Sequence, residues 1–174
     1  MNHLDTLIQR VATGDDAALH SLYQETCSAV YGYALSILRN PHDAQDVMQD
    51  TYLRIIDAAC HYSSQGKPLS WVLTIVKNLS LMKLRSSKRT ADMPIEEEYF
   101  PADTPGLARE DAIVLHAALK HLDDIQRQIV ILHAVNGMKH REIAQLLDVP
   151  LSTILSKYRR TLKKLRRILE EGES

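Results

Sequence analysis

Apolar residues recur at intervals of three and four along most of this chain, which is the spacing of one buried face on an α-helix. Convincing alternation of apolar and polar residues, the pattern of a strand, does not occur. The sequence therefore predicts an all-α protein. The expected helices cover residues 4–13, about 15–39, 41–59, 69–87, 140–147 and a longer stretch from about 151.

Two of the predicted helix boundaries are marked by residues with strong local preferences. Gly14 suits a left-handed C-terminal stop, and Asp15 or Asp16 can accept hydrogen bonds from the amides that open the next helix. Asn40 is a favourable N-cap directly before Pro41, because proline fits the first helical position. We therefore expect sharp breaks near residues 14 and 40.

The segment 88–107 differs in composition from its neighbours. It contains three prolines, one glycine and a cluster of acidic residues, which is typical of a linker rather than of a packed element. We therefore expect two small helical domains joined by a flexible acidic linker. The domains cover residues 1–88 and 108–174, and the linker covers residues 89–107.

Composition narrows the class of protein. The chain has 174 residues, of which 45% are hydrophobic and 25% charged, so it can bury a core. No apolar run approaches the roughly 18 residues of a membrane span, and the N-terminus lacks the pattern of a signal peptide. Cys27 and Cys60 are too few for a disulfide framework and lack metal-ligand spacing. We expect a soluble cytoplasmic protein with no membrane insertion, no metal and no cofactor.

Charge is strongly segregated, although the formal net charge is only -1. Residues 1–60 carry a net charge of -5 and residues 92–124 of -7, whereas residues 67–91 carry +6 and residues 139–167 carry +7. Two basic blocks separated by an acidic one favour two surfaces that face a polyanion. Ordinary solvated helix faces are the alternative interpretation.

The expected helix 41–59 has an acidic face. Its carboxylates lie three, four and seven residues apart and so share one side of the helix; they are Asp43, Asp46, Asp50 and Asp57. Apolar positions such as Val47 and Ile55 fall on another side. This arrangement suits a basic partner helix, with a solvated acidic surface as the alternative.

The C-terminal segment has the layout of a helix-turn-helix, in which a short helix, a turn at residues 148–150 and a longer helix follow one another. The core shared by the two helices is expected to contain Ile143, Leu147, Val149 and Ile154. One stripe of the longer helix is apolar: Ile154, Tyr158, Leu162, Leu165 and Leu169. The other side carries Ser152, Ser156, Lys157, Arg159, Arg160, Lys163, Lys164 and Arg167. Such a helix fits the major groove of DNA; an amphipathic terminal helix with a solvated basic face is the alternative.

Three segments carry motifs in a characteristic order. Residues 22–55 contain the run Asp43-Ala44-Gln45-Asp46-Val47-Met48-Gln49-Asp50-Thr51-Tyr52. Residues 62–89 place Trp71 at the opening of a helix and Asn78 seven residues later, and residues 118–154 lead into the helix-turn-helix. Together they resemble region 2, the promoter-melting segment and region 4 of the extracytoplasmic function (ECF) sigma factors of bacterial RNA polymerase.

The resemblance implies a dissociable subunit that directs core RNA polymerase to promoters. The clamp coiled coil of the β′ subunit is then expected to contact Asp46, Gln49, Asp50 and Arg54. Recognition of the -10 element on the non-template strand is expected to use His61, Tyr62, Ser63, Ser64, Lys67, Trp71, Lys77, Asn78 and Arg85. Recognition of the -35 element is expected to use Arg141, Ser152, Thr153, Ser156, Lys157, Arg160 and Lys164. Further expected partners are the β flap of the polymerase and an anti-sigma factor.

Three departures from the family pattern lie in the helix-turn-helix, and one of them is Ser152, which stands where glycine is frequent. Asp148 stands where glycine is frequent, but aspartate tolerates a left-handed conformation, so the turn is expected to survive. Leu155 stands where a basic residue is frequent, which weakens the case for base reading at that position.

The sequence lacks the common motifs of several enzyme classes. Phosphate-loop, dinucleotide, serine-hydrolase and zinc-protease motifs are missing from the sequence, and its eight histidines are scattered. We therefore expect no enzymatic activity in this chain itself. The alternative function is a helix-turn-helix repressor or activator whose N-terminal helices sense a ligand or form a dimer.

Overall fold

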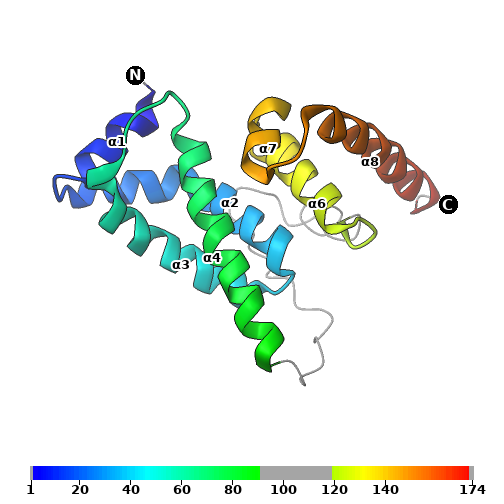
Figure 1. Ribbon diagram of the computed structural model, residues 1–174, viewed down its shortest axis with the longest axis horizontal. Coiled ribbons are helices and arrows are strands. Elements are labelled where there is room, and N and C mark those ends of the chain that lie inside the picture. Colours follow the sequence, from blue (N-terminus) through cyan, green and yellow to red (C-terminus); the bar gives the residue numbers. More distant parts are fainter. Residues whose placement is uncertain (1, 91–118, 173–174) are drawn as a thin grey trace. The chain divides into compact units, whose positions relative to one another are not determined.

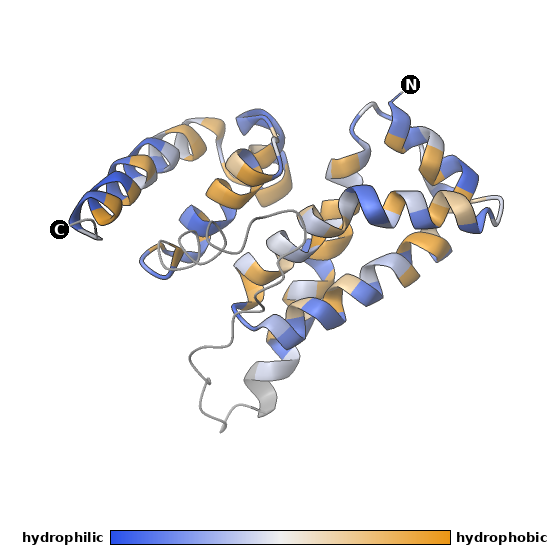
Figure 2. Cartoon of the chain, turned by 180° about the vertical axis from the view of Figure 1, so that it is seen from behind, coloured by the Kyte–Doolittle hydropathy of each residue, from blue (hydrophilic) through white to orange (hydrophobic). Residues whose placement is uncertain are grey.

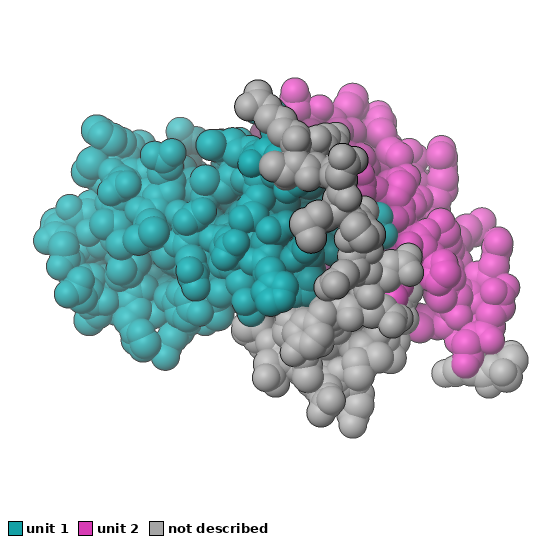
Figure 3. All heavy atoms as spheres, turned by 90° about the horizontal axis from the view of Figure 1, so that it is seen from below, with its two compact units in different colours: residues 1–99 teal, residues 100–174 magenta. Residues whose placement is uncertain are grey.

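The computed structural model describes residues 2–90 and 119–172, and these ranges contain helices and turns without any strand. The predicted all-α class is confirmed. The chain divides into two compact units, residues 1–99 and 100–174, which Figure 3 distinguishes by colour. The predicted linker 89–107 lies almost entirely outside the described residues.

Residues 2–90 of unit 1 form four α-helices (Figure 1): α1 (His3–Val11), α2 (Asp16–Leu38), α3 (Pro41–Ala58) and α4 (Pro68–Thr90), with a 3-10 turn η1 (Ala59–His61) after α3. Helices α2, α3 and α4 pack against one another, and α1 packs chiefly on α2. The fully buried side chains include Ile8, Leu22, Tyr33, Ile55 and Leu73. Burial of each such side chain contributes roughly 1.5–3 kcal/mol, so this shared core holds the helix faces described below in fixed positions.

The predicted breaks in unit 1 are confirmed. The Asp15 side chain accepts a hydrogen bond from the amide of Ala18 at 3.0 Å and caps α2. Asn40 likewise accepts from the amide of Asp43 at 3.1 Å, with Pro41 in the first turn of α3. Helix α2 ends on Arg39, whose backbone is left-handed with φ of 56°.

A buried pair of hydroxyl groups joins α2 to α3. Thr26 Oγ1 lies 2.7 Å from the Tyr52 hydroxyl and donates to the Leu22 carbonyl at 2.6 Å. The Tyr52 hydroxyl therefore donates to Thr26. Burial raises the pKa of Tyr52, which keeps this hydroxyl protonated.

Unit 2 contains α6 (Asp124–Val130), a π-helical turn η2 (Ile131–Val135), α7 (His140–Leu147) and α8 (Leu151–Gly172). Both α6 and α7 pack against α8. The helix-turn-helix layout is confirmed, and Asp148 adopts the left-handed conformation expected of it, with φ of 53° and ψ of 48°. Side chains buried in this unit include Ile129, Leu132, Ile143 and Ile154.

Two details of the predicted packing in unit 2 were wrong. Leu146, rather than Leu147, is the buried leucine at the end of α7. On α8, Leu162 and Leu169 are 45% and 47% exposed instead of buried. The reason for the exposure on α8 is length: α6 and α7 have seven and eight residues whereas α8 has 22, so among residues 119–172 these two helices cannot cover the whole of α8. Figure 2 shows that hydrophobic and hydrophilic positions are mixed along α8.

None of the helices within residues 2–90 and 119–172 is long and apolar enough to cross a membrane.

Candidate functional site

The solvent-facing side of α3 combines acidic and apolar side chains. Asp46, Gln49 and Asp50 are exposed, as expected of residues that contact a partner. The same side exposes Leu53 to 62% and Ile56 to 45%, which sequence reasoning missed. Their positions in the sequence, among the acidic residues of α3, could have indicated this exposure. Large apolar residues on the polar side of an amphipathic helix are unusual unless a partner covers them.

A lysine of α4 engages the acidic face of α3. Lys83 Nζ lies 2.9 Å from Asp46 Oδ2 and 3.4 Å from Asp43 Oδ1. The hydrogen bond to Asp46, together with the attraction of both carboxylates, raises the pKa of Lys83 despite its partial burial. The pair fixes α3 relative to α4 and compensates part of the negative charge of Asp46.

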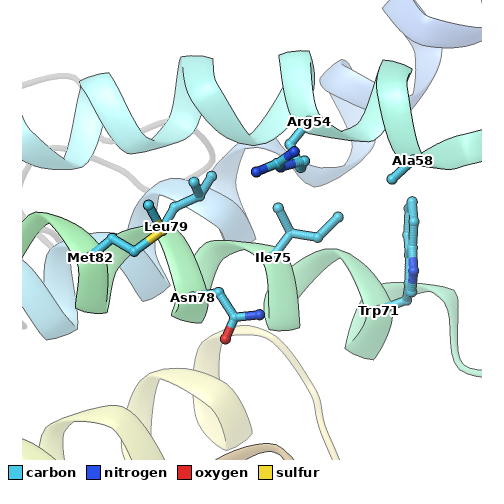
Figure 4. A pocket seen from close by; sticks show the side chains of 7 residues that line it. All are labelled: Arg54, Ala58, Trp71, Ile75, Asn78, Leu79 and Met82. Carbon is cyan, nitrogen blue, oxygen red and sulfur yellow. The ribbon is translucent and has the colours of Figure 1, made fainter.

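A pocket between α3 and α4 brings together residues for which the sequence analysis expected different roles, namely contact with the polymerase and recognition of the -10 element. It is lined by Arg54, Ala58, Trp71, Ile75, Asn78, Leu79 and Met82 (Figure 4). Arg54 enters from α3, and the other polar residue, Asn78, directs its amide away from Arg54. Asn78 is exposed and Met82 is 57% exposed, so this pocket opens to solvent.

The segment that joins η1 to α4 carries solvent-exposed polar side chains. His61, Ser63, Ser64 and Lys67 are all exposed, and Gly66 has a positive φ of 73°. Tyr62 differs from them because it is only partly exposed and its ring lies 4.8 Å from that of Trp71 at an interplanar angle of 57°. Its hydroxyl donates a hydrogen bond to Asp5 Oδ1 of α1.

Further polar and basic groups follow along α4. Asn78 and Arg85 are exposed, and Lys77 is partly buried. Thr74 is also exposed, but its hydroxyl donates to the Ser70 carbonyl at 2.8 Å within the same helix. The helix thus presents an amide and cationic side chains on its accessible surface.

The candidate -35 residues occupy α7 and the first turns of α8. Exposed positions are Arg141, Ser152, Arg160 and Lys164, and partly buried ones are Thr153, Ser156 and Lys157. Ser156 donates its hydroxyl to the Thr153 carbonyl at 3.1 Å. Lys157 Nζ lies 3.9 Å from Asp123 Oδ2. The ammonium group of Lys157 is therefore paired with a carboxylate at the start of α6.

An aromatic cluster supports the helix-turn-helix and was not foreseen from the sequence. The rings of His133 and His140 stack with centroids 4.0 Å apart, and Tyr158 of α8 meets both edge-on at 4.9 and 4.7 Å. His140 Nε2 is buried and has no hydrogen-bond partner within the part of the chain that the structure describes. Burial, followed by the proximity of His133, lowers the pKa of His140.

Comparison with known proteins places both units in one family. The family model for sigma-70 region 2 matches residues 22–90, and the model for sigma-70 region 4 matches residues 112–165. The ECF RNA polymerase sigma factor SigK of Mycobacterium tuberculosis is 30% identical over 177 residues, which cover 96% of this chain and 94% of the relative. SigK of Mycolicibacterium vanbaalenii is 29% identical over 174 residues, covering 95% and 89%.

Solved structures agree at the level of the fold. CnrH, in complex with the cytosolic domain of CnrY, aligns with a TM-score of 0.67 at 22% identity, covering 96% of this chain and 97% of that one. The sigma factor RpoE from Bartonella quintana, in complex with the anti-sigma factor NepR, aligns with a TM-score of 0.70 at 23% identity, covering 86% and 97%. With regions 2 and 4 both matched and relatives aligned almost end to end, this chain belongs to the ECF sigma factors of RNA polymerase.

Proposed function

We propose that this sigma factor binds core RNA polymerase through the solvent-facing side of α3. Asp46, Gln49 and Asp50 would meet a basic coiled coil of the β′ clamp, with Arg54 at one flank. Leu53 and Ile56 add apolar area among these polar groups, and protein interfaces bury such area at their centre. The mixture of acidic and apolar side chains supports a protein partner rather than a merely solvated face.

Promoter opening is proposed for the loop of residues 61–67 together with α4. Strand separation needs groups that accept an extruded base and cations that hold the displaced backbone. Asn78 has an exposed amide for a base edge, and Lys67, Lys77 and Arg85 supply positive charge nearby in the sequence. His61, Ser63 and Ser64 offer exposed polar groups for the walls of a base pocket.

The observation that carries the proposal is the pocket between α3 and α4. Arg54, proposed for polymerase contact, lines it together with Trp71 and Asn78, proposed for -10 recognition. Both helices also share the buried core of unit 1. A unit of this kind couples docking on the polymerase to placement of the -10 strand without a hinge between the two functions.

The -35 element is proposed to be read by the helix-turn-helix of unit 2. Base edges or the nearest phosphates would be faced by Arg141, Ser152, Thr153, Ser156, Lys157 and Arg160, and Lys164 would neutralise the backbone. Unit 2 would also contact the β flap of the polymerase. The proposed -10 surface of unit 1 and the proposed -35 surface of unit 2 would then both be bound to the same polymerase molecule.

An anti-sigma factor is a further proposed partner. Two similar solved structures are complexes, one with the cytosolic domain of CnrY and one with the anti-sigma factor NepR. We propose a cytoplasmic location and assign the chemistry of RNA synthesis to the polymerase, not to this chain.

Transcription in vitro tests this proposal directly. Core RNA polymerase is incubated with and without the purified full chain and supplied with a genomic promoter library. Sequence-selective transcripts that need both proteins are expected. A chain that binds a palindromic duplex tightly on its own and adds no transcripts would instead indicate a repressor.

A further inference from the structure

Asp5 is a fully buried carboxylate in an N-terminal helix that the proposed promoter contacts do not include. It is 0% exposed. Asp5 Oδ2 accepts a hydrogen bond from the backbone amide of Asn2 at 3.1 Å and so completes the capping box of α1. Asp5 Oδ1 accepts a second hydrogen bond from the hydroxyl of Tyr62, which is 57 residues away in the sequence.

A capping box alone does not account for the burial of this carboxylate. Capping carboxylates function at solvent-exposed helix ends, whereas burial of a charge is unfavourable unless hydrogen bonds compensate for lost water. The hydrogen bond from Tyr62, followed by those from Ser64 and Asn2, outweighs burial and lowers the pKa of Asp5. Asp5 therefore stays ionised, and as an acceptor it binds the tyrosine hydroxyl more strongly than a neutral group would.

Tyr62 connects Asp5 to the candidate -10 surface. Its ring packs against Trp71, with 4.8 Å between the centroids. Trp71 lines the pocket between α3 and α4 together with Asn78. A chain of contacts thus runs from α1 through Tyr62, the first residue after η1, to the pocket, and the exposed residues 63–67 follow Tyr62 directly.

We propose that Asp5 is a positioning residue for -10 recognition, which holds Tyr62 and thereby sets the place of the loop 61–67 and of Trp71 relative to Asn78. The inference rests on the proposed function of this loop and α4. It makes α1 part of the promoter-reading apparatus, and it assigns the Tyr62 hydroxyl an intramolecular role instead of a direct contact with DNA.

Three full-length variants test the proposal in reconstituted holoenzyme: Tyr62→Phe, Asp5→Ala and the double variant. The matched control is Tyr52→Phe, which also removes a tyrosine hydroxyl from a hydrogen bond inside unit 1, namely that to Thr26. Formation of the open complex is followed by permanganate reactivity of unpaired thymines, and base preference is measured with a library randomised in the -10 element. Asn78→Ala is included as a reference for loss of base contact.

Tyr62→Phe and Asp5→Ala are each expected to slow open-complex formation about tenfold, the scale of one hydrogen bond to a charged group. Both are expected to relax preference in the -10 element and to leave -35 preference unchanged. The double variant should be no slower than Asp5→Ala, because Tyr62→Phe removes only a contact that Asp5→Ala has already removed. Tyr52→Phe should lower thermal stability without changing base preference.

Several outcomes would overturn the proposal. One such outcome is that Tyr62→Phe forms open complexes at the wild-type rate and with the wild-type -10 base preference, while Asn78→Ala is defective. The loop would then need no support from Asp5. Effects of Asp5→Ala and Tyr62→Phe that multiply in the double variant would show that the residues act separately. Should Asp5→Ala fail to fold, Tyr62→Phe and its control still decide the matter. A wild-type chain that forms no open complex with core enzyme would instead refute the proposed function itself.

Discussion

Lys83 on α4 holds Asp46 on α3, with 2.9 Å between Nζ and Oδ2. The pair is accessible to water, with side-chain exposures of 29% and 61%, so its contribution to stability is at most about 1 kcal/mol. Its main effect is on charge. Asp46 shares its negative charge with Lys83, whereas Asp50, one turn further along α3, is exposed and forms no ion pair with Lys83 or another cation of residues 2–90 and 119–172.

The first prediction concerns the acidic face of α3. The double change Asp46→Arg with Asp50→Arg is expected to weaken binding to core polymerase strongly, since placing like charges together at an interface costs several kcal/mol. Asp50→Arg alone should have the larger share of the effect, because Asp46 is already partly neutralised. Co-purification and titration of labelled chain with core enzyme measure the change. Gln24→Arg, at an exposed position of α2, is the control; core binding by the double variant at wild-type strength would contradict the prediction.

The second prediction concerns Asn78. Asn78→Ala is expected to retain binding of holoenzyme to duplex promoter and to lose open-complex formation, measured by permanganate footprinting. A template already unpaired at the -10 element should recover much of the lost transcription, because the base then need not be extruded. Thr74→Ala, one turn earlier, is the control because its hydroxyl is engaged by the Ser70 carbonyl. Equal activity of Asn78→Ala and wild type on both templates would make Asn78 merely structural.

The third prediction separates phosphate contacts from base reading in α8. Lys164→Ala is expected to weaken binding to all -35 sequences alike and to lower the magnitude of the salt slope by about one. Arg160→Ala is expected to cost roughly 1–3 kcal/mol and to relax preference at one base. Selection from a randomised -35 library at two salt concentrations measures both. A new preferred sequence with Lys164→Ala, or an unchanged one with Arg160→Ala, would mean that α8 lies differently in the groove.

The fourth prediction is a pH dependence of unit 2 that comes from His140. Its folded pKa lies below the ordinary value of 6.5, through burial and the neighbouring His133. Below pH 6.5 the unfolded state therefore binds more protons than the folded state, and the free energy of unfolding falls as pH falls towards the lowered folded pKa. Full stability is present above pH 6.5.

Chemical unfolding of the full chain at a series of pH values, followed by a probe in unit 2, measures this effect. His140→Phe keeps an aromatic ring beside Tyr158 and should reduce the loss of stability in acid. His121→Phe, at an exposed position of the same unit, is the control and should leave the loss unchanged. An identical acid response in wild type and His140→Phe would refute the assignment.

Local sequence signals were sufficient for several helix boundaries within the described residues of this protein. Asn40 and Pro41 determine the start of α3 through the capping hydrogen bond and the fixed proline φ, and neither depends on distant residues. Asp148 likewise forms the turn of the helix-turn-helix through its own backbone preference. Such features follow from the chemistry of a few neighbouring residues, so periodicity and capping rules predicted them.

The contacts between distant segments could not be read in the same way. Nothing in the local pattern pairs Asp5 with Tyr62 or Lys83 with Asp46, because both pairs depend on how α1, α3 and α4 pack. The exposure of Leu162 has the same origin, since helical spacing gives the direction of a side chain but not whether another helix is there to cover it. Tertiary packing therefore decided which candidate residues remain available to a partner.

Three large apolar side chains of unit 1 are exposed in the free protein and affect its stability in the cell; they are Leu53, Ile56 and Met82. Each leaves about half or more of its surface to water, and burial of a side chain of this size yields roughly 1.5–3 kcal/mol. A copy without a partner is thus prone to self-association and to capture by chaperones and proteases. The abundance of the protein is then expected to follow the supply of its partners, so that a change in partner concentration alters its turnover even when its synthesis is constant.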